Sequence, residues 1–127
     1  MSDTEKIQVV LVKPGKNAEL GHIENKLEEY QNIVDGYIEQ VSPFEKHIAI
    51  ICNEEGKIQG LMPNRAICDD RGEILDIIFG TFFICGIGED DYCSLSDEDA
   101  AKYLKIFEKA EMFKYDLINN RLVKIYI

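Results

Sequence analysis

Four polar side chains stand among apolar residues in the middle of the chain, where they could form a binding site. They are Asn64, Arg65, Asp76 and Thr81. Together they could bind a small molecule or a nucleotide derivative, because ligand pockets combine apolar walls with a few polar groups that fix orientation. Arg65 and Asp76 could also form a buried pair, or a salt bridge at the edge of a sheet that carries no function.

Catalytic and phosphate-binding patterns do not match this sequence. Gly86-Ile87-Gly88 lacks the third glycine of a dinucleotide fingerprint, since residue 91 is an aspartate. Gly15-Lys16 has no glycine five residues before Gly15, so it is not a phosphate loop. The sequence also contains no Gly-x-Ser-x-Gly motif. We therefore assign no catalytic residue and no cofactor, and an enzymatic activity is the less favoured interpretation.

The cysteines are too far apart in the sequence for a common metal or redox motif. Cys52, Cys68, Cys85 and Cys93 are separated by 16, 17 and 8 residues, whereas zinc ribbons and redox dithiols use closely spaced pairs. His47 and Cys52 lie on one predicted strand at an odd spacing, so their side chains are expected on opposite faces. We expect four reduced thiols and no bound metal.

The segment from Glu89 to Asp99 has the highest charge density in the chain, with six acids and no base. Ser96 is placed to cap a helix, and the three acids after it fall in the first turn, where carboxylates stabilise exposed amides. The other three acids are Glu89, Asp90 and Asp91. They do not alternate as the calcium ligands of an EF-hand do. We therefore assign them to recognition of a protein partner with a basic surface.

The net charge of the chain is −10, from 24 acids and 14 bases, and no third of the sequence has an excess of bases. Direct binding of nucleic acid is not expected, because it needs a face of lysines and arginines. Solubility alone accounts for such a charge; the sharper interpretation is a surface that attracts a basic partner or imitates nucleic acid. The polar N-terminus and the lack of an apolar run of ~18 residues indicate a cytoplasmic protein without membrane contact.

Two copies of one short motif predict tandem hairpins in the middle of the chain. Residues 51–58 and 67–74 each contain an apolar pair, Asn or Asp, two polar residues, glycine, a charged residue and isoleucine. This order is typical of a type I turn closed by a glycine at positive φ. Gly56 and Gly72 are the expected positive-φ residues, and the two hairpins would form a meander.

The remaining patterns predict further strands and two helices. Strands are expected over residues 7–12, 18–23, 37–41, 47–52, 57–61, 65–68, 74–79 and 81–87. One helix is expected between Asn25 as its N-cap and Gly36 as its stop, and a second helix is expected after Ser96. The predicted fold class is α+β, with a mixed, mainly antiparallel sheet built as a hairpin meander and packed by two helices.

The length of 127 residues fits one domain. Residues 1–6 are expected to form an N-terminal tail, and residues 7–113 a single α+β domain. Residues 114–127 form a C-terminal extension. Because its last residues alternate between polar and apolar, it is a possible edge strand in this chain or a strand offered to a neighbour.

Several segments in order resemble the family catalogued as domain of unknown function 3846. These segments are residues 9–16, 36–39, 52–57, 60–66, 77–84 and 94–97. The resemblance runs from about Ile7 to Phe113. Families of this kind occur among proteins of bacterial phages and conjugative elements, so the resemblance implies an accessory role inside the cell. It implies no activity, no ligand and no catalytic residue.

Two functions remain open from the sequence. The first is a non-catalytic protein-interaction module of a phage or mobile element, which binds a protein through Glu89, Asp90 and Asp91. The alternative is a small-molecule or nucleotide-derivative binding protein, with the pocket near Asn64 and Arg65 described above. A pocket of at least roughly 300 Å³ at those residues would favour the alternative. The sequence predicts no particular oligomeric state.

Overall fold

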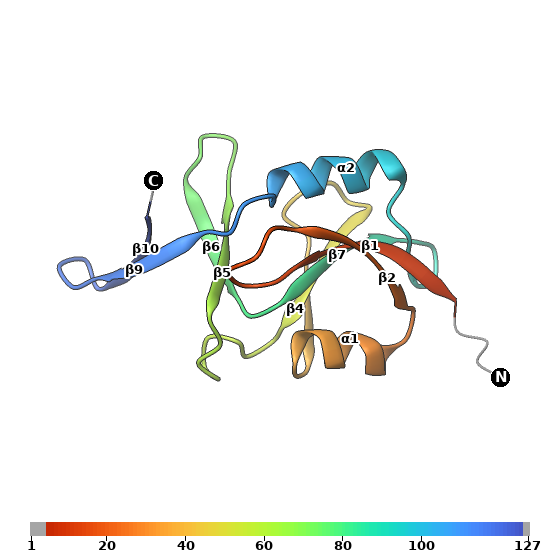
Figure 1. The fold of residues 1–127 in the computed structure, drawn as a ribbon, viewed down its shortest axis with the longest axis horizontal. Coiled ribbons are helices and arrows are strands. Elements are labelled where there is room, and N and C mark those ends of the chain that lie inside the picture. The colour runs from red at the N-terminus through yellow and green to blue at the C-terminus, as the bar shows by residue number, and fades with distance from the viewer. Residues whose placement is uncertain (1–4, 126–127) are drawn as a thin grey trace.

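The computed structural model describes residues 5–125, and its centre is an antiparallel sheet (Figure 1). The strands of this sheet are β1 (Lys6–Val12), β2 (Glu19–Glu24), β3 (Ile38–Val41), β4 (Ile48–Asn53), β7 (Phe82–Ile87) and β8 (Tyr92–Cys93). Five of them follow the order β2-β1-β7-β4-β3, and the short β8 pairs with β7. The helices are α1 (Leu27–Val34) and α2 (Asp97–Ile106). The predicted α+β class, with a mainly antiparallel sheet and two helices, is confirmed.

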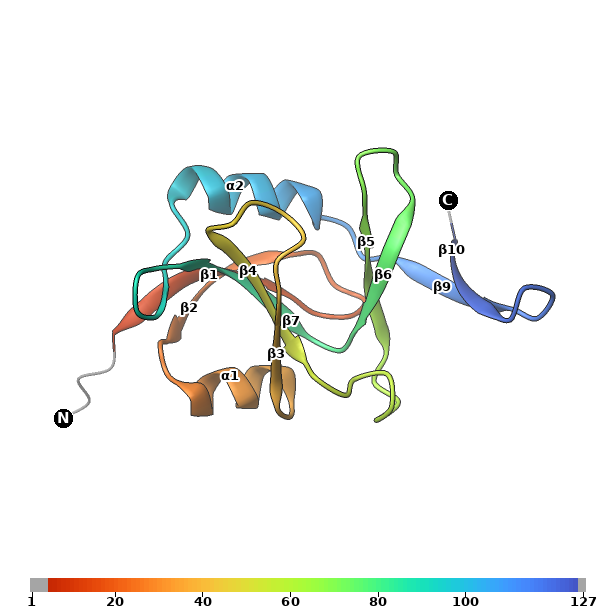
Figure 2. The ribbon, with the colours of Figure 1, turned by 180° about the vertical axis from the view of Figure 1, so that it is seen from behind.

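The two helices cover opposite faces of the sheet (Figures 1 and 2). The central strands β4 and β7 are apolar along most of their length, which is the pattern of a strand buried on both faces. Ile50 and Phe82 pack with Tyr103 of α2 in one core, while Phe83 packs with Tyr30 of α1 in the other. No helix among the described residues is long and apolar enough to cross a membrane.

The second predicted hairpin is confirmed, and it forms a small sheet of its own. Strands β5 (Pro63–Cys68) and β6 (Ile74–Phe79) pair antiparallel across a turn in which Gly72 has a φ of 81°. The Asp69 carboxylate accepts hydrogen bonds of 2.9 Å from the backbone N–H groups of Arg71 and Glu73, which fixes the turn. The hairpin places Ile67 and Ile78 on the same core as α2.

The first predicted hairpin is wrong. Residues 54–60 form successive turns, so the expected return strand over residues 57–61 does not exist. Gly56 is not among the glycines at positive φ, whereas Gly60 is, with a φ of 74°. The physical reason is that β3 and β7 already occupy both edges of β4, which leaves no edge for a hairpin partner.

The caps of the helices agree with the sequence at one helix only. Ser96 is the N-cap of α2, and its Oγ accepts a hydrogen bond of 3.0 Å from the Asp99 backbone N–H, as predicted. The prediction for α1 is wrong, because its N-cap is Lys26, without a side-chain hydrogen bond. Asn25 instead donates a hydrogen bond of 3.0 Å to the carbonyl of Tyr92. The left-handed residue that ends α1 is Asp35, with a φ of 62°, so Gly36 is not the stop.

The C-terminal segment forms a hairpin that projects from the rest of the molecule (Figure 1). Strands β9 (Met112–Asp116) and β10 (Arg121–Ile125) pair only with each other among the described residues, in a sheet of two strands. The C-terminal alternation thus belongs to a hairpin arm that starts at Met112, and residues 126–127 lie outside the described residues. Of the predicted N-terminal tail, residues 1–4 also lie outside them, and Lys6 already belongs to β1.

Candidate functional site

Asn64 and Arg65 are completely buried and make hydrogen bonds within the fold. The Asn64 amide donates to the carbonyls of Val12 and Gly80 at 3.0 and 2.8 Å, and its Oδ1 accepts from Arg65 Nη1 at 2.8 Å. Burial lowers the pKa of the Arg65 guanidinium, and the nearby Glu111 carboxylate partly offsets this effect. The two side chains connect segments of the core, which is a structural use of their polar groups.

Asp76 and Thr81 lie apart from this buried pair. Asp76 is exposed on β6, where its carboxylate accepts a hydrogen bond of 2.8 Å from the Ile77 backbone N–H. It is paired in register with Ile67, whereas Arg65 is paired with Ile78. Within the described residues no ion pair joins Arg65 to Asp76, and the half-buried Thr81 lines neither of the hollows that Asp76 lines. The structure therefore does not bring the four residues together.

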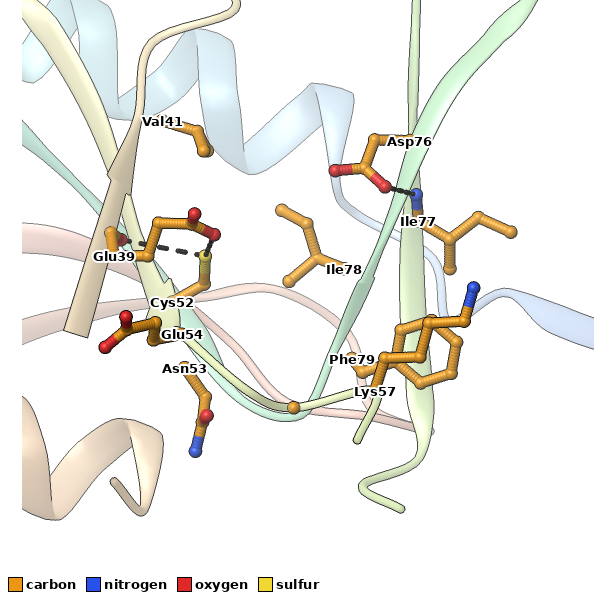
Figure 3. A pocket seen from close by; sticks show the side chains of 11 residues that line it. Glu39, Val41, Cys52, Asn53, Glu54, Lys57, Asp76, Ile77, Ile78 and Phe79 are labelled. Atoms are coloured by element: carbon orange, nitrogen blue, oxygen red, sulfur yellow. Dashed lines mark hydrogen bonds between the residues drawn. The ribbon is translucent and has the colours of Figure 1, made fainter. Parts of the chain in front are cut away.

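One of the hollows at Asp76 is a small acidic cleft between β3, β4 and β6 (Figure 3). Its volume is about 150 Å³, and Glu39 and Cys52 face Asp76 and Ile78 across it. The Cys52 thiol donates a weak hydrogen bond of 3.7 Å to the Glu39 carbonyl. Burial, with a smaller contribution from the Glu39 carboxylate, raises the pKa of this thiol to about 12. A protonated thiol is a poor nucleophile, so this cleft is not arranged for thiol catalysis.

Glu89, Asp90 and Asp91 form the turn between β7 and β8, at the end of the molecule where β1 begins (Figure 1). The Gly88 backbone N–H donates to the Asp91 carbonyl at 2.8 Å, which closes the turn. The Asp91 carboxylate accepts from the Tyr92 backbone N–H at 2.8 Å, and from Asn25 Nδ2 at 3.3 Å. Asp91 therefore has a structural function as well as a charge.

The other two acids of this turn are exposed beside a shallow hollow. Within the described residues, the carboxylates of Glu89 and Asp90 take part in no hydrogen bond or ion pair. The hollow has a volume of about 350 Å³, and the partly buried Ile87 and Tyr92 line it together with the three acids. Apolar side chains together with exposed carboxylates suit an apolar group that has a cation next to it.

The hairpin arm, residues 112–125, exposes large apolar side chains at its tip. Leu117 is 85% exposed and Ile118 is 93% exposed, and Tyr115 is also exposed. The Asp116 carboxylate holds the tip in place by accepting hydrogen bonds from the backbone N–H groups of Ile118 and Asn119, at 3.0 and 3.3 Å. The pKa of this carboxyl group is lowered, and the largest cause is the hydrogen bonds that it accepts from the side chain and backbone of Asn119. The tip is an ordered turn that presents two apolar side chains to solvent.

An open groove separates the hairpin arm from β6. It has a volume of about 520 Å³, and its apolar lining is Ile74, Ile77 and Phe79 from β6 with Tyr115 and Leu122 from the arm. Its polar lining residues are Lys57, Asp76, Asn120 and Arg121. The groove and the exposed tip together give the arm an extended surface with several large apolar side chains. Among the described residues, no group of three or more His, Cys, Asp or Glu side chains is placed to hold a metal ion.

Sequence reasoning missed the tip of the arm. Two adjacent large apolar residues, Leu117 and Ile118, come directly before Asn119-Asn120. Asparagine pairs favour tight turns, and Asn120 has a φ of 53°. A turn flanked by an alternating strand places the residues before it at an exposed tip, so this signal was present in the sequence.

These features can be set against known proteins. Residues 7–108 match the family model described as "domain of unknown function (DUF3846)", which covers most of the chain, and the protein belongs to this family. Comparisons with curated proteins and with solved structures found no match. The family match ends at residue 108, so the hairpin arm lies beyond the matched residues.

Proposed function

We propose that this protein is a non-catalytic protein-interaction module and that its hairpin arm is the contact element. The observation that carries the proposal is the exposure of Leu117 and Ile118 at the tip of a two-stranded sheet that projects from the body. A hairpin of two strands is at most marginally stable alone in water, so an arm of this kind gains stability when it packs on another surface.

The expected contribution of the tip to binding is considerable. Full burial of a leucine or isoleucine side chain contributes about 1.5–3 kcal/mol. Because Asp116 already orders the turn through its backbone hydrogen bonds, binding costs less conformational entropy than for a disordered segment. Apolar side chains in an ordered, projecting turn are therefore suited to be the central residues of an interface.

The acidic turn supports the same function from the other end of the molecule. The exposed carboxylates of Glu89 and Asp90 are free to attract a basic surface, which raises association rates. We propose them as a second contact with the partner; they are two of the three acids, with Asp91, that the sequence assigned to this role. A role as an accessory protein of a phage or mobile element, inside the bacterial cell, is supported by the sequence resemblance described above.

The small-molecule alternative has weaker support. Asp76 lines a cleft of about 150 Å³ and the open groove of about 520 Å³ beside the arm, but Asn64, Arg65 and Thr81 line neither of them. Asn64 and Arg65 are buried and fully engaged with neighbouring carbonyls, so they are not placed to contact a ligand at that cleft. A protein surface is the better match for the exposed apolar arm.

The proposal is tested by capture followed by direct binding. The tagged protein is incubated with an extract of its native host, captured proteins are identified, and each candidate is purified and titrated against the parent and two variants. The double variant Leu117→Ser/Ile118→Ser should bind more weakly, with a dissociation constant at least about tenfold higher than that of the parent. The control Tyr37→Ser removes an apolar side chain that is 71% exposed in the loop after α1, and it should bind as the parent does. Equal affinity of the parent and the double variant for every captured protein would overturn the proposal.

A further inference from the structure

We infer that the surface that receives the hairpin arm is the acidic turn of a second copy of this chain, so that copies associate head to tail. The inference rests on the proposed function in one respect, because it takes the arm as a contact element. It adds the identity of a partner and the place where the arm binds. The support comes from charge, from the chemistry of the two surfaces and from their positions in the molecule.

The arm and the rest of the chain have opposite net charge. Residues 112–125 contain three bases and one acid, whereas residues 1–111 contain 11 bases and 23 acids. Two of the bases of the arm, Lys114 and Arg121, are exposed on either side of the tip. A basic arm on an otherwise strongly acidic chain is electrostatically complementary to another copy of the same chain.

The acidic turn also has apolar side chains that could contact the tip of the arm. Its hollow of about 350 Å³ is lined by Ile87 and Tyr92 and bordered by Glu89 and Asp90. The tip of the arm has Leu117 and Ile118 at its centre with Lys114 and Arg121 nearby. Each surface therefore has apolar side chains, and Lys114 and Arg121 are complementary to the carboxylates of the turn, while the Asp116 carboxylate at the tip is engaged in its own hydrogen bonds. The Asp91 carboxylate stays in its local hydrogen bonds and is not needed for this contact.

The positions of the two surfaces determine the form of assembly. The arm projects from one end of the longest axis of the molecule, and the turn between β7 and β8 lies toward the other end in both views (Figures 1 and 2). An arm therefore does not reach the turn of its own chain. Contact between two different surfaces is heterologous, so it produces either a ring or an open chain of copies.

The test is sedimentation velocity of the full chain from micromolar to millimolar concentration at low salt. The parent should show a weight-average mass that rises with concentration. Variant A, Lys114→Glu/Arg121→Glu, changes the charge of the arm, and variant B, Glu89→Lys/Asp90→Lys, changes the charge of the turn. Each should associate at least about tenfold more weakly than the parent when studied alone.

Mixing variants A and B gives the decisive result. Variant B still has a parental arm and variant A a parental turn, and the acidic arm of A is complementary to the basic turn of B, so a mixture should associate again. A contact between two arms would instead leave variant B self-associating alone, and that outcome would overturn the inference. Leu117→Ser/Ile118→Ser, which keeps all charges of the arm, should also abolish association. Circular dichroism and thermal melting confirm that each variant is folded.

The failure of this inference differs from the failure of the proposed function. A parent that stays monomeric at every concentration, or a mixture of A and B that stays monomeric while the parent associates, overturns the head-to-tail contact. Neither result concerns the binding of another protein to the arm, which the capture and titration with Leu117→Ser/Ile118→Ser decide separately.

Discussion

The guanidinium of Arg65 donates two hydrogen bonds to the carbonyl oxygen of Phe107, from Nε at 3.3 Å and from Nη2 at 3.0 Å. Phe107 is the C-terminal cap of α2, and its carbonyl lies at the negative end of the helix dipole. Nη2 also donates to the Lys16 carbonyl at 2.6 Å. One buried cation therefore connects β5, the end of α2 and the loop after β1.

Replacement of Arg65 should destabilise the fold. Arg65→Lys should lower the free energy of unfolding by about 1–3 kcal/mol, because a lysine cannot reproduce the fork of donors and leaves buried carbonyls without partners. Urea unfolding followed by circular dichroism measures the change. The matched control is Arg71→Lys in the exposed turn of the β5–β6 hairpin, which should change stability by less than about 0.5 kcal/mol. Equal stability of both variants would contradict a structural role for Arg65.

The N-cap of α2 gives a second prediction. Ser96→Ala removes the acceptor of the Asp99 backbone N–H and should lower the free energy of unfolding by about 1 kcal/mol. Ser96→Asp keeps a side-chain oxygen at this position and should be close to the parent in the same thermal and urea measurements. If Ser96→Ala and Ser96→Asp have the same free energy of unfolding, the hydrogen bond from the Asp99 backbone N–H to residue 96 contributes little to stability.

The two glycines of the repeated motif should respond differently to alanine. Gly72→Ala should cost about 1 kcal/mol through its φ of 81° alone, because its Cβ position is in open space, and Gly72→Asn should cost less. At Gly56 a Cβ would lie 2.6 Å from the Phe79 carbonyl oxygen, so Gly56→Ala should cost about 1–3 kcal/mol through overpacking. Urea unfolding of the three variants checks this. If Gly56→Asn were clearly more stable than Gly56→Ala, backbone conformation and not lack of space would limit this position.

These glycines also show how far the sequence determines the fold. The motifs at Gly56 and Gly72 are nearly identical locally, but only the second closes a hairpin, because β6 is free to pair with β5. At Gly56 the pairing of β4 with β3 and β7 decides the outcome, and both partners lie outside the motif, one before it and one well after it in the sequence. Local patterns therefore predicted the fold class, the Gly72 turn and the Ser96 cap, whereas strand order depended on contacts that one short motif does not contain.

The candidate site was predictable to a similar extent. The exposed turn of Glu89 and Asp90 could be found from charge alone, because carboxylates without a capping role are rarely buried. The proposed pocket depended on the register of β5 and β6, which has two irregularities. This register pairs Asp76 with Ile67, and the Arg65 side chain extends instead to Phe107. Such a register is set by packing on the core through Ile67 and Ile78, which the sequence alone does not specify.

The thiols should react in two classes. Cys68 and Cys93 are exposed, whereas Cys52 and Cys85 are buried, and burial raises the pKa of each buried thiol to about 12. A thiol reagent should therefore label two cysteines in the native protein at neutral pH and four after unfolding in urea. Labelling of four in the native protein, or stoichiometric zinc by elemental analysis, would contradict reduced thiols in the two environments.

The same shifts predict a loss of stability in alkali. The unfolded thiols lose their protons from about pH 9, while the folded ones keep theirs until about pH 12. Below pH 9 the thiols are protonated in both states, so their contribution to the free energy of unfolding is complete. As the pH rises toward 12 only the unfolded thiols ionise, so the free energy of unfolding decreases by up to about 1.4 kcal/mol per pH unit for each thiol. Urea unfolding across this range should give a smaller slope for Cys52→Ala/Cys85→Ala than for the parent. Cys68→Ala/Cys93→Ala, which changes two exposed thiols, is the control and should keep the parental slope.

The exposed acids of the turn between β7 and β8 give a prediction for binding to any partner, including a second copy. As salt rises from about 50 to 300 mM, the Debye length decreases from roughly 14 to 6 Å, so a contact made through Glu89 and Asp90 should weaken. Glu89→Lys/Asp90→Lys should bind more weakly at low salt and should lose the salt dependence of the parent.

The thermal stability of Glu89→Lys/Asp90→Lys should stay close to that of the parent, because these two carboxylates take part in no hydrogen bond or ion pair within the described residues. Glu28→Lys/Asp70→Lys changes two exposed acids, one in α1 and one in the turn between β5 and β6, and is the control for net charge. Equal loss of binding in both variants would assign the effect to overall charge, and unchanged binding of Glu89→Lys/Asp90→Lys at every salt concentration would remove the turn from the contact.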